Sequence, residues 1–554
     1  MSAVLDLENS KRPVNRLPLE VLAGVFETFT QTTLDLDACG FPFPEPYRPP
    51  KKDTVIRELL CCSHVCRYWR RVFDLFPRLS STLILYGAYL ADPPAHRHKL
   101  MKLFLSRSGT HPLEVHVSRH SSVSAIVEQS HRLRHLQIAC GWDPSIQRLN
   151  VIMFRQPAPR LEYFDCSALE EIKAYTHIPR TYKLPVVFGG QVPLLRRLKL
   201  VGFSSWAGNA FHDLTHICLV GFQSSQPDFR EILDLLHNCP FVQELYLASF
   251  SAPFIEDMAR RTVVGERVMP AARPAKPIAL RRLSLSKCNL PEIERILAYL
   301  QLPQDTHLYL SYPKHSRIEF GDVIDRFPSH FENLLDLHSL SLNLPRNEVM
   351  ATGPSGSVRL PGHGLEMWHH FLSPFLAHAL TELWIEGESS VAVKKWLKWG
   401  KIFAALPLLE KICMKSWYTT SIVGTLCSPP VGVSPSPAHV PQRAFCERLH
   451  TLFITEMWDP IRKKTSIAFL DLLHCLETRS ARGLPIRHLK ICLDPEPPTR
   501  RGGVAHIAWS SEDSKVSILR RYVDLIEKDV EYQGIEVSGE FQERTHPQYW
   551  PRWA

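Results

Sequence analysis

The sequence has little glycine and no long apolar segment. Its 25 glycines are outnumbered by 44 prolines, whereas average chains contain more glycine than proline. Residues 1–13 carry two acidic side chains and no apolar core segment, unlike a secretory signal peptide. The longest uncharged run, residues 416–442, contains five prolines and therefore cannot form a membrane-spanning helix. From these absences we expect a soluble protein of the cytoplasm or the nucleus that makes no membrane contact.

Motifs that carry catalysis or bind metals are also missing. The sequence contains no GxxxxGK[ST] phosphate loop, no GxSxG nucleophile turn and no HExxH zinc motif. Cys61, Cys62, His64 and Cys66 lie close together, but no second ligand pair stands at zinc spacing. Cys62 and Cys66 fit the apolar stripe of a helix instead. We expect no catalytic residue, no metal site and no cofactor, hence a protein that is not itself an enzyme.

The net charge and the cysteines indicate which class of protein this is. The net charge is +9 over 554 residues, too small an excess for the many phosphate contacts of a nucleic-acid partner. A hydrophobic fraction of 45% with 22% charged residues is typical of a folded chain. The 14 cysteines are irregularly spaced, and no export signal precedes them, so reduced thiols are expected.

Two amphipathic helices are predicted near the N-terminus. Residues 16–29 place large apolar side chains at the 3-4-3 spacing of one helical face, with Pro18 in the first turn. A proline-rich stretch at 41–52 cannot be helical. A second helix is expected from Thr54 until Pro77 ends it. Its apolar face would be formed by Val55, Leu59, Cys62, Val65, Cys66, Trp69, Val72, Phe73 and Phe76.

The motifs of this region resemble an F-box, a helical module that docks on the Skp-type adaptor of cullin-RING ubiquitin ligases. The resemblance rests on the segments LPLEVL at 17–22, VF at 25–26, HVCRYWRR at 64–71 and PRL at 77–79. An insertion at about 31–53 separates the two parts, and no tryptophan follows Leu79. The resemblance implies adaptor contacts at the matching positions, which are Leu17, Pro18, Glu20, Val21, Leu22, Phe26, Val65, Cys66 and Trp69. For each of them the alternative is a place in the core of the module, above all for Phe26 and Trp69.

A six-residue pattern, apolar-x-x-apolar-x-apolar, recurs twelve times at a mean spacing of about 32 residues. Each unit has the period-two alternation of a short strand. Helices are expected between the strands, most clearly at 228–236, 291–300 and 466–477. Prolines shortly before several units separate strand from helix. The units begin at residues 133, 161, 195, 214, 242, 280, 305, 337, 380, 409, 449 and 486.

The pattern resembles the leucine-rich repeat, in which parallel strands and helices alternate in a solenoid. The segment LRRLSLSKCNL at 280–290 matches LxxLxLxxCxL in full. The three preceding units carry Phe203, Phe222 and Phe250 where the family has asparagine or cysteine. We therefore expect a stacked phenylalanine spine there, in an array that is irregular because its units vary from 19 to 43 residues.

The variable positions of the strands are expected to line one exposed, concave face. They include nine basic and five acidic side chains, with aromatic residues in four units. Exposed aromatic and arginine side chains are frequent anchors of protein interfaces. This composition favours a protein partner with an acidic or phosphorylated segment, and the alternative is a solvated face with contacts elsewhere. The candidate contact residues are Arg196, Arg197, Lys199, Tyr246, Arg281, Arg282, Tyr309, Trp384 and Phe453.

The sequence thus predicts an α/β protein with a short helical module followed by an irregular leucine-rich-repeat-like solenoid. The expected boundaries are a flexible N-terminus at 1–14, the module at 15–85, the solenoid at 86–532 and a tail at 533–554. The two resemblances together imply a substrate-recognition subunit of an SCF-type ubiquitin ligase. The alternative is a non-catalytic interaction scaffold whose N-terminal helices only cap the array.

Overall fold

The protein was analysed as a computed structural model, in which the chain divides into two compact units. The first comprises Met1–Leu280, Tyr299–Gln301 and Trp550–Ala554, and the second comprises Arg281–Ala298 and Leu302–Tyr549. The structure describes residues 12–36, 53–86, 94–118, 124–141, 155–169, 183–221, 229–249, 275–288, 293, 296–303, 305–311, 336–344, 347–354, 356–361, 379–387, 399–404, 406–415, 419–427, 445–456, 458–459, 464–465, 469–493 and 517–528. Within these residues the fold is mixed α/β with mostly parallel strands.

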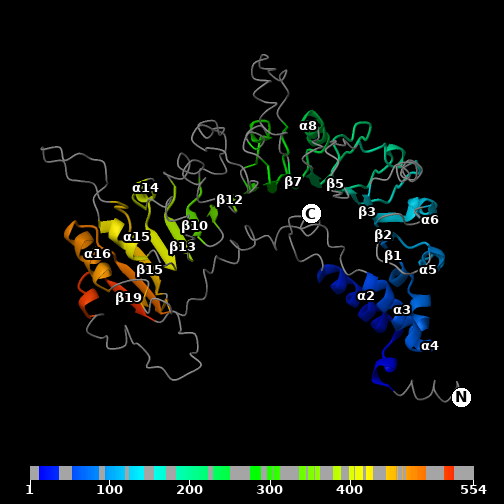
Figure 1. Cartoon of the computed structure of the whole chain (residues 1–554), viewed down its shortest axis with the longest axis horizontal. Helices are drawn as coiled ribbons and strands as arrows, with labels where there is room; N and C mark the ends of the chain where they lie inside the picture. The colour runs from blue at the N-terminus through cyan, green and yellow to red at the C-terminus, as the bar shows by residue number, and fades with distance from the viewer. Residues whose placement is uncertain are drawn as a thin grey trace, which may run out of the picture. The chain divides into compact units, whose positions relative to one another are not determined.

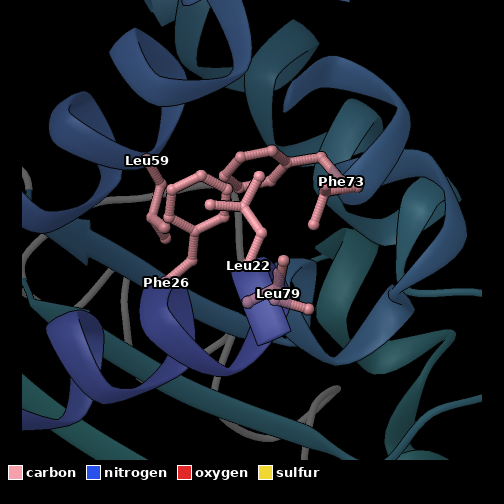
Figure 2. Packing of buried hydrophobic residues seen from close by; sticks show 7 residues of the cluster. Leu22, Phe26, Leu59, Phe73 and Leu79 are labelled. Atoms are coloured by element: carbon pink, nitrogen blue, oxygen red, sulfur yellow. The ribbon is translucent and has the colours of Figure 1, made fainter. Parts of the chain in front are cut away.

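The first unit begins with a helical module that has its own apolar core. Its elements are the 3-10 helix η1 (Pro13–Arg16), the helices α2 (Leu19–Leu36), α3 (Asp53–Val65) and α4 (Arg67–Leu75), and the 3-10 helix η2 (Pro77–Ser80). The side chains of Leu22, Phe26, Leu59, Phe73 and Leu79 point toward one another between these helices (Figure 2). Ala23 and Val72 complete the cluster, and their burial provides the main stabilisation of the module.

Two predictions for this module were wrong in detail. Helix α2 continues to Leu36, so the first six residues of the expected insertion at 31–53 are helical, and residues 37–52 lie outside the described residues. The expected helix from Thr54 to Phe76 is two helices. Cys66 lies between them in an extended conformation, and its sulfur accepts a hydrogen bond from the Trp69 backbone N–H at 3.5 Å. Because Cys66 caps α4, it does not belong to the apolar stripe.

A parallel strand ladder follows in the first unit. Neighbouring strands pair in chain order, and the helices α5 (Pro94–Arg107), α6 (Ser124–Val127) and α8 (Phe229–Asn238) gather on one side of them (Figure 1). Short 3-10 helices are η3 (Ser130–Arg132) and η4 (Phe188–Gly190). The strands are β1 (Thr82–Tyr86), β2 (Leu113–Ser118), β3 (Leu133–Gly141), β4 (Tyr163–Leu169), β5 (Arg197–Val201), β6 (His216–Val220) and β7 (Glu244–Ala248).

The second unit contains a longer ladder with helices on one side, α14 (Trp399–Ala404), α15 (Thr419–Cys427) and α16 (Phe469–Ala481) (Figure 1). Its strands are β8 (Arg282–Ser286), β9 (His307–Leu310), β10 (Ser339–Asn343), β11 (Glu348–Thr352), β12 (Ser357–Leu360), β13 (Glu382–Glu386), β14 (Lys411–Lys415), β15 (Thr451–Glu456), β18 (His488–Leu493) and β19 (Leu525–Lys528). A separate two-stranded ribbon joins β16 (Trp458–Asp459) to β17 (Lys464–Thr465).

All twelve predicted six-residue units form strands. Their fourth and sixth residues are buried in every unit, as in β5, where Leu198 and Leu200 point inward. Of the predicted phenylalanine spine, Phe203 is buried, whereas Phe222 and Phe250 lie outside the described residues. Strand β1 begins inside the boundaries expected for the helical module, and it pairs with β2 in the ladder.

The second ladder departs from the expected all-parallel arrangement. Strands β11 and β12 form an antiparallel hairpin that is inserted between β9 and β10. At its turn the Gly353 N–H donates to the Gly356 carbonyl at 2.9 Å. A Cβ at Gly353 would lie 2.5 Å from the Asp336 carbonyl oxygen, so the turn requires glycine.

The thiols and the helices have two further properties. The eleven cysteines whose side chains the structure describes carry free thiols. Among the helices that the structure describes, none combines the length and the apolarity that crossing a membrane requires.

Candidate functional site

The segment 15–17, which leads into helix α2, is held against helix α4 by two hydrogen bonds. The Tyr68 hydroxyl donates to the Leu17 carbonyl, and the Trp69 indole N–H donates to the Asn15 side-chain oxygen at 2.7 Å. The Trp69 ring also packs edge-to-face on Phe26 with 5.0 Å between centroids. Trp69 therefore makes contacts within the module, which is the alternative given for it in the sequence analysis. The sequence analysis did not identify Asn15 and Tyr68, whose roles depend on partners more than 50 residues away.

The nine candidate adaptor contacts divide by exposure. Leu22 and Phe26 are buried in the core, so their side chains are not available at the surface. Leu17, Cys66 and Trp69 are half-buried, and Pro18 and Glu20 are exposed. Two valines of the set are unusually accessible: Val21 is 49% exposed and Val65 is 60% exposed.

A further exposed valine lies one helical turn after Val21. Val25 is 51% exposed, and its spacing of four residues places it beside Val21 on the surface of α2. The motif VF at 25–26 contained this residue, but the alternation of buried Phe26 with exposed Val25 becomes visible only in the folded module. The exposed valines do not contribute to the core, which is complete without them.

The second candidate surface is the outward face of the first ladder, which we define as the second, third and fifth residues of each strand unit. The third residues form a row across β2–β7 that contains Glu114, His135, Tyr163, Arg197, His216 and Glu244. At both ends of the row a histidine contacts a carboxylate, since His135 lies 3.6 Å from Glu114 and His216 lies 3.7 Å from Glu244. Burial lowers the pKa of His135, which favours its neutral form at pH 7.

The fifth residues form a parallel row that is largely neutralised internally. Asp165 is 1% exposed in its side chain and accepts hydrogen bonds from Gln137 at 3.0 Å and Ser167 at 3.2 Å. Lys199 lies 3.5 Å from the same carboxylate. Lys199 was a predicted partner contact, but its charge is already compensated by a buried aspartate. Such a paired lysine adds little to the attraction of an external anion.

Two arginines, one on β5 and one just before it, differ from the neighbouring cations in having no described carboxylate partner. Arg196 and Arg197 are both exposed, and no carboxylate pairs with either of them within the described residues. Arg196 donates instead to the Leu195 and Asp213 carbonyls, at 3.4 and 3.3 Å. By contrast, Arg134 on the neighbouring surface is paired with Glu162 at 2.9 Å. The positive charge of this face is therefore concentrated at Arg196 and Arg197.

One predicted contact of the first ladder is not accessible. Tyr246 is only 8% exposed and packs with Cys218 and Ala248. It was expected to be an exposed aromatic anchor, but the strand positions around it are apolar and enclose its ring. Burial also raises the pKa of the Cys218 thiol to about 12, so this cysteine is an unreactive thiol at neutral pH.

The remaining candidates belong to the second unit. Arg281 is exposed just before β8, and Arg282 and Tyr309 are half-buried on the paired strands β8 and β9. Trp384 and Phe453 flank Cys413 across β13, β14 and β15. Burial raises the pKa of the Cys413 thiol to about 12.

The side chain of Trp384 contacts two neighbouring residues on the outward face. Its indole N–H donates to Glu382 at 3.2 Å, and the Lys411 ammonium lies 4.8 Å from its ring centroid. Lys411 also pairs with Glu382 at 3.4 Å. The ring orientation is thus fixed in advance, which reduces the entropy lost when a partner packs on it.

The cysteine and histidine cluster at 61–66 does not gather into a ligand set. Cys61 is exposed, Cys62 packs against the module core, and Cys66 caps α4. Across the part of the chain that the structure describes, no group of three or more potential ligands could hold a metal ion.

Comparison with known proteins adds no family assignment. No family model matches the chain, and no curated protein matches its sequence.

Proposed function

We propose that this chain is the substrate-recognition subunit of an SCF-type cullin-RING ubiquitin ligase. In this proposal the N-terminal module is an F-box that docks on a Skp-type adaptor, and the leucine-rich-repeat-like ladders bind a protein substrate. The observation that carries the proposal is the exposure of Val21, Val25 and Val65 on a module whose core is already complete. Exposed valines at motif positions are what a docking surface requires.

The competing explanation is an interaction scaffold in which the helices only cap the array. Helix α3 and η2 do contact strand β1, so the module covers part of the ladder. Capping accounts for the side of the module that faces β1. It does not account for the exposed valines, since a cap is expected to present a polar outer surface.

The contribution of the chain to ubiquitin transfer would be positional. Its own residues bind the adaptor at one end and the substrate at the other, while other subunits carry out the chemistry. Tethering raises the effective concentration of a substrate lysine near the charged conjugating enzyme, which accelerates a step that is otherwise bimolecular.

Replacing Val21 and Val25 together with glutamate should weaken adaptor binding at least about tenfold, because two apolar contacts would be lost and two charges desolvated. The fold should be retained, since both side chains are about half exposed. The measurement is titration of the purified full-length chain with a purified Skp-type adaptor, alongside circular dichroism and thermal melting of each variant.

The matched control is Lys102→Glu, which makes the same change in net charge at an exposed position of α5, outside the helical module. It should bind the adaptor as the unaltered chain does. If V21E/V25E binds normally, these valines are not the docking surface. If the unaltered chain is folded but does not bind the adaptor at all, the receptor function is wrong and the scaffold explanation prevails.

The proposed substrate carries an acidic or phosphorylated segment that meets the outward face of the first ladder. Arg196 and Arg197 support this, because they are exposed and neither of them pairs with a carboxylate within the described residues. Arginine binds carboxylate and phosphate through two parallel hydrogen bonds, which gives both affinity and orientation.

Reversing both charges in R196E/R197E should weaken binding of a fluorescent peptide rich in aspartate and phosphoserine about tenfold or more. Fluorescence anisotropy at low and high salt measures the effect, and the salt dependence should shrink in the variant. The control, K99E/K102E, makes the same change in net charge at exposed positions of α5. Equal losses in both variants would indicate a non-specific charge effect and contradict the assignment.

A further inference from the structure

Three of the tight turns that lead into strands carry an exposed apolar side chain, and all three belong to the first unit. In each turn the N–H of the fourth residue donates to the carbonyl of the first, at 3.1 Å in 192–195 and at 3.2 Å in 239–242 and 277–280. Leu194 is 46% exposed, Phe241 is 54% exposed and Ile278 is 55% exposed. A single exposed apolar residue is ordinary on a protein surface, and only a group of them indicates a contact site.

The turns themselves keep these side chains out of the core. The fourth residue of each turn begins the strand unit and is buried, since Leu195 is 2% exposed and Val242 and Leu280 are 0% exposed. Pro193 and Pro240 occupy the second position of the first two turns, where the fixed φ of proline favours the turn. The residues at the corner of each turn are therefore left outside the core.

The three apolar residues lie along one edge of the ladder, where the strands begin. The Ile278 N–H donates to the Pro240 carbonyl at 3.0 Å, which joins the turn of Ile278 to the turn of Phe241. Strands β5 and β7 both pair with β6, so Leu194 and Phe241 are two strand spacings apart, or about 10 Å. We call Leu194, Phe241 and Ile278 the apolar edge.

An arginine lies between the two parts of the apolar edge. The Arg196 guanidinium donates to the Asp213 carbonyl at 3.3 Å, in the segment that leads into β6. Because β6 lies between β5 and β7, this bond places the guanidinium between Leu194 and Phe241. The edge therefore presents an apolar group, a cation and a second apolar group in succession.

The charges around the apolar edge are mainly positive. Exposed cations on the turns or at the strand starts are Arg160, Arg196, Arg197 and Lys276. Of the acids there, Glu162 pairs with Arg134 at 2.9 Å, and Asp213 is exposed. A partner segment that carries negative charge is thus attracted to this edge, whereas a basic segment is repelled.

We propose that the apolar edge binds a substrate segment in which two large apolar residues are three positions apart and acidic residues stand between them. Residues i and i+3 of an extended polyproline II segment share a face and lie about 9 Å apart, which matches the spacing of the edge. One apolar residue of the segment packs on Leu194, the other packs on Phe241 and Ile278, and an acidic residue between them meets Arg196. This inference rests on the proposed substrate-receptor function and specifies the kind of segment that is recognised.

The two kinds of contact contribute differently. Packing removes water from side chains that are about half exposed in the free chain, and this burial supplies most of the affinity. An exposed ion pair supplies less, because water and salt screen it. Arg196 instead selects an acidic residue and orients it through paired hydrogen bonds.

The test titrates the purified full-length chain with three fluorescent peptides of equal length and follows their anisotropy. The first peptide has the central sequence leucine-aspartate-aspartate-phenylalanine. The second has serine in place of the two apolar residues, and the third has serine in place of the two aspartates. We expect the first peptide to bind at least about tenfold more tightly than the second, since only the first can bury apolar surface on the edge. The third should also bind more weakly than the first.

Substitutions in the chain locate the contact. In Leu194→Ser and in Phe241→Ser the advantage of the first peptide over the second should fall to about threefold or less. Both variants should stay folded by circular dichroism, because the altered side chains are about half exposed. The matched control is Leu103→Ser, which removes a leucine of similar exposure, 40%, from α5 and should leave the advantage unchanged.

Four outcomes would contradict the inference. Equal binding of the first and second peptides would leave an acidic substrate in place but remove the apolar edge from its recognition. If no peptide binds, the acidic-segment assignment fails as well, while the adaptor titration of V21E/V25E still judges the receptor function separately. If Leu194→Ser and Phe241→Ser weaken binding no more than Leu103→Ser does, the contact lies elsewhere. A concentration-dependent dimer in sedimentation that Phe241→Ser abolishes would show that a second copy of the chain covers the edge instead.

Discussion

Replacing Phe26 with alanine is expected to destabilise the N-terminal helical module by about 3–5 kcal/mol, the usual cost of truncating a buried phenylalanine. Phe26 lies at the centre of the module core (Figure 2), 5.0 Å from the Trp69 ring and 5.3 Å from the Phe73 ring between centroids. A small module buries too little additional surface to compensate for such a loss. The module should therefore unfold at temperatures at which the strand ladders remain folded.

The measurement is hydrogen–deuterium exchange on the full-length chain, read peptide by peptide. Peptides from α2 and α4 should lose protection in Phe26→Ala, whereas peptides from β3–β7 should keep it. The matched control is Val25→Ala, which truncates the exposed neighbour on the same helix and should change stability by at most about 0.5 kcal/mol. Unchanged protection of α2 in Phe26→Ala would contradict the assignment of this core. Comparison with V21E/V25E separates loss of the fold from loss of the docking surface.

The second large loss of stability is expected from a substitution in the hairpin inserted into the second ladder. Glu348 on β11 and Arg359 on β12 form a buried ion pair, with side chains 3% and 9% exposed. Arg359 also lies 5.9 Å from the Tyr309 ring centroid, and burial raises the pKa of Tyr309 to about 12. Glu348→Ala would leave the guanidinium buried without its partner, which should cost about 3–5 kcal/mol.

Removing both charges tests whether the loss of stability in Glu348→Ala comes from the unpaired charge of Arg359. The double variant E348M/R359M should be less destabilised than Glu348→Ala, because no unpaired charge stays buried. Urea unfolding of the two single methionine variants and the double variant gives the coupling energy between the two positions. Simple additivity of the two single effects would show that the charges do not depend on each other.

Local sequence pattern was sufficient to predict the strands. Each six-residue unit, such as LRRLKL at 195–200, encodes a strand through the alternation of its own side chains, and all twelve predicted units form strands. The pattern did not identify β1, β2 or β19, whose segments lack the leading leucine unit. It also missed the break at Cys66, because a cysteine that caps a helix and a cysteine on its apolar stripe have the same local spacing.

The candidate sites were predicted less completely, because charge pairing and burial depend on the neighbouring strands. Arg197 and Lys199 are equivalent in sequence, both at variable positions of one strand. They differ in the structure because Asp165 of the neighbouring strand neutralises Lys199, whereas the acids in the row of Arg197 contact histidines. Tyr246 likewise matched the other aromatic candidates in sequence but is enclosed by its lateral neighbours.

The sequence by itself determined the apolar positions, the repeat, the helical module and the absence of recognisable catalytic motifs, because these follow from the order of side chains along a short segment. Only the tertiary structure decided where a hairpin enters the second ladder and which arginines keep an unpaired charge. Those features depend on register between segments about 30–50 residues apart, and no local periodicity encodes the register. Glycine scarcity and proline excess thus describe how the units are separated, whereas the lateral pairs decide what their surface can bind.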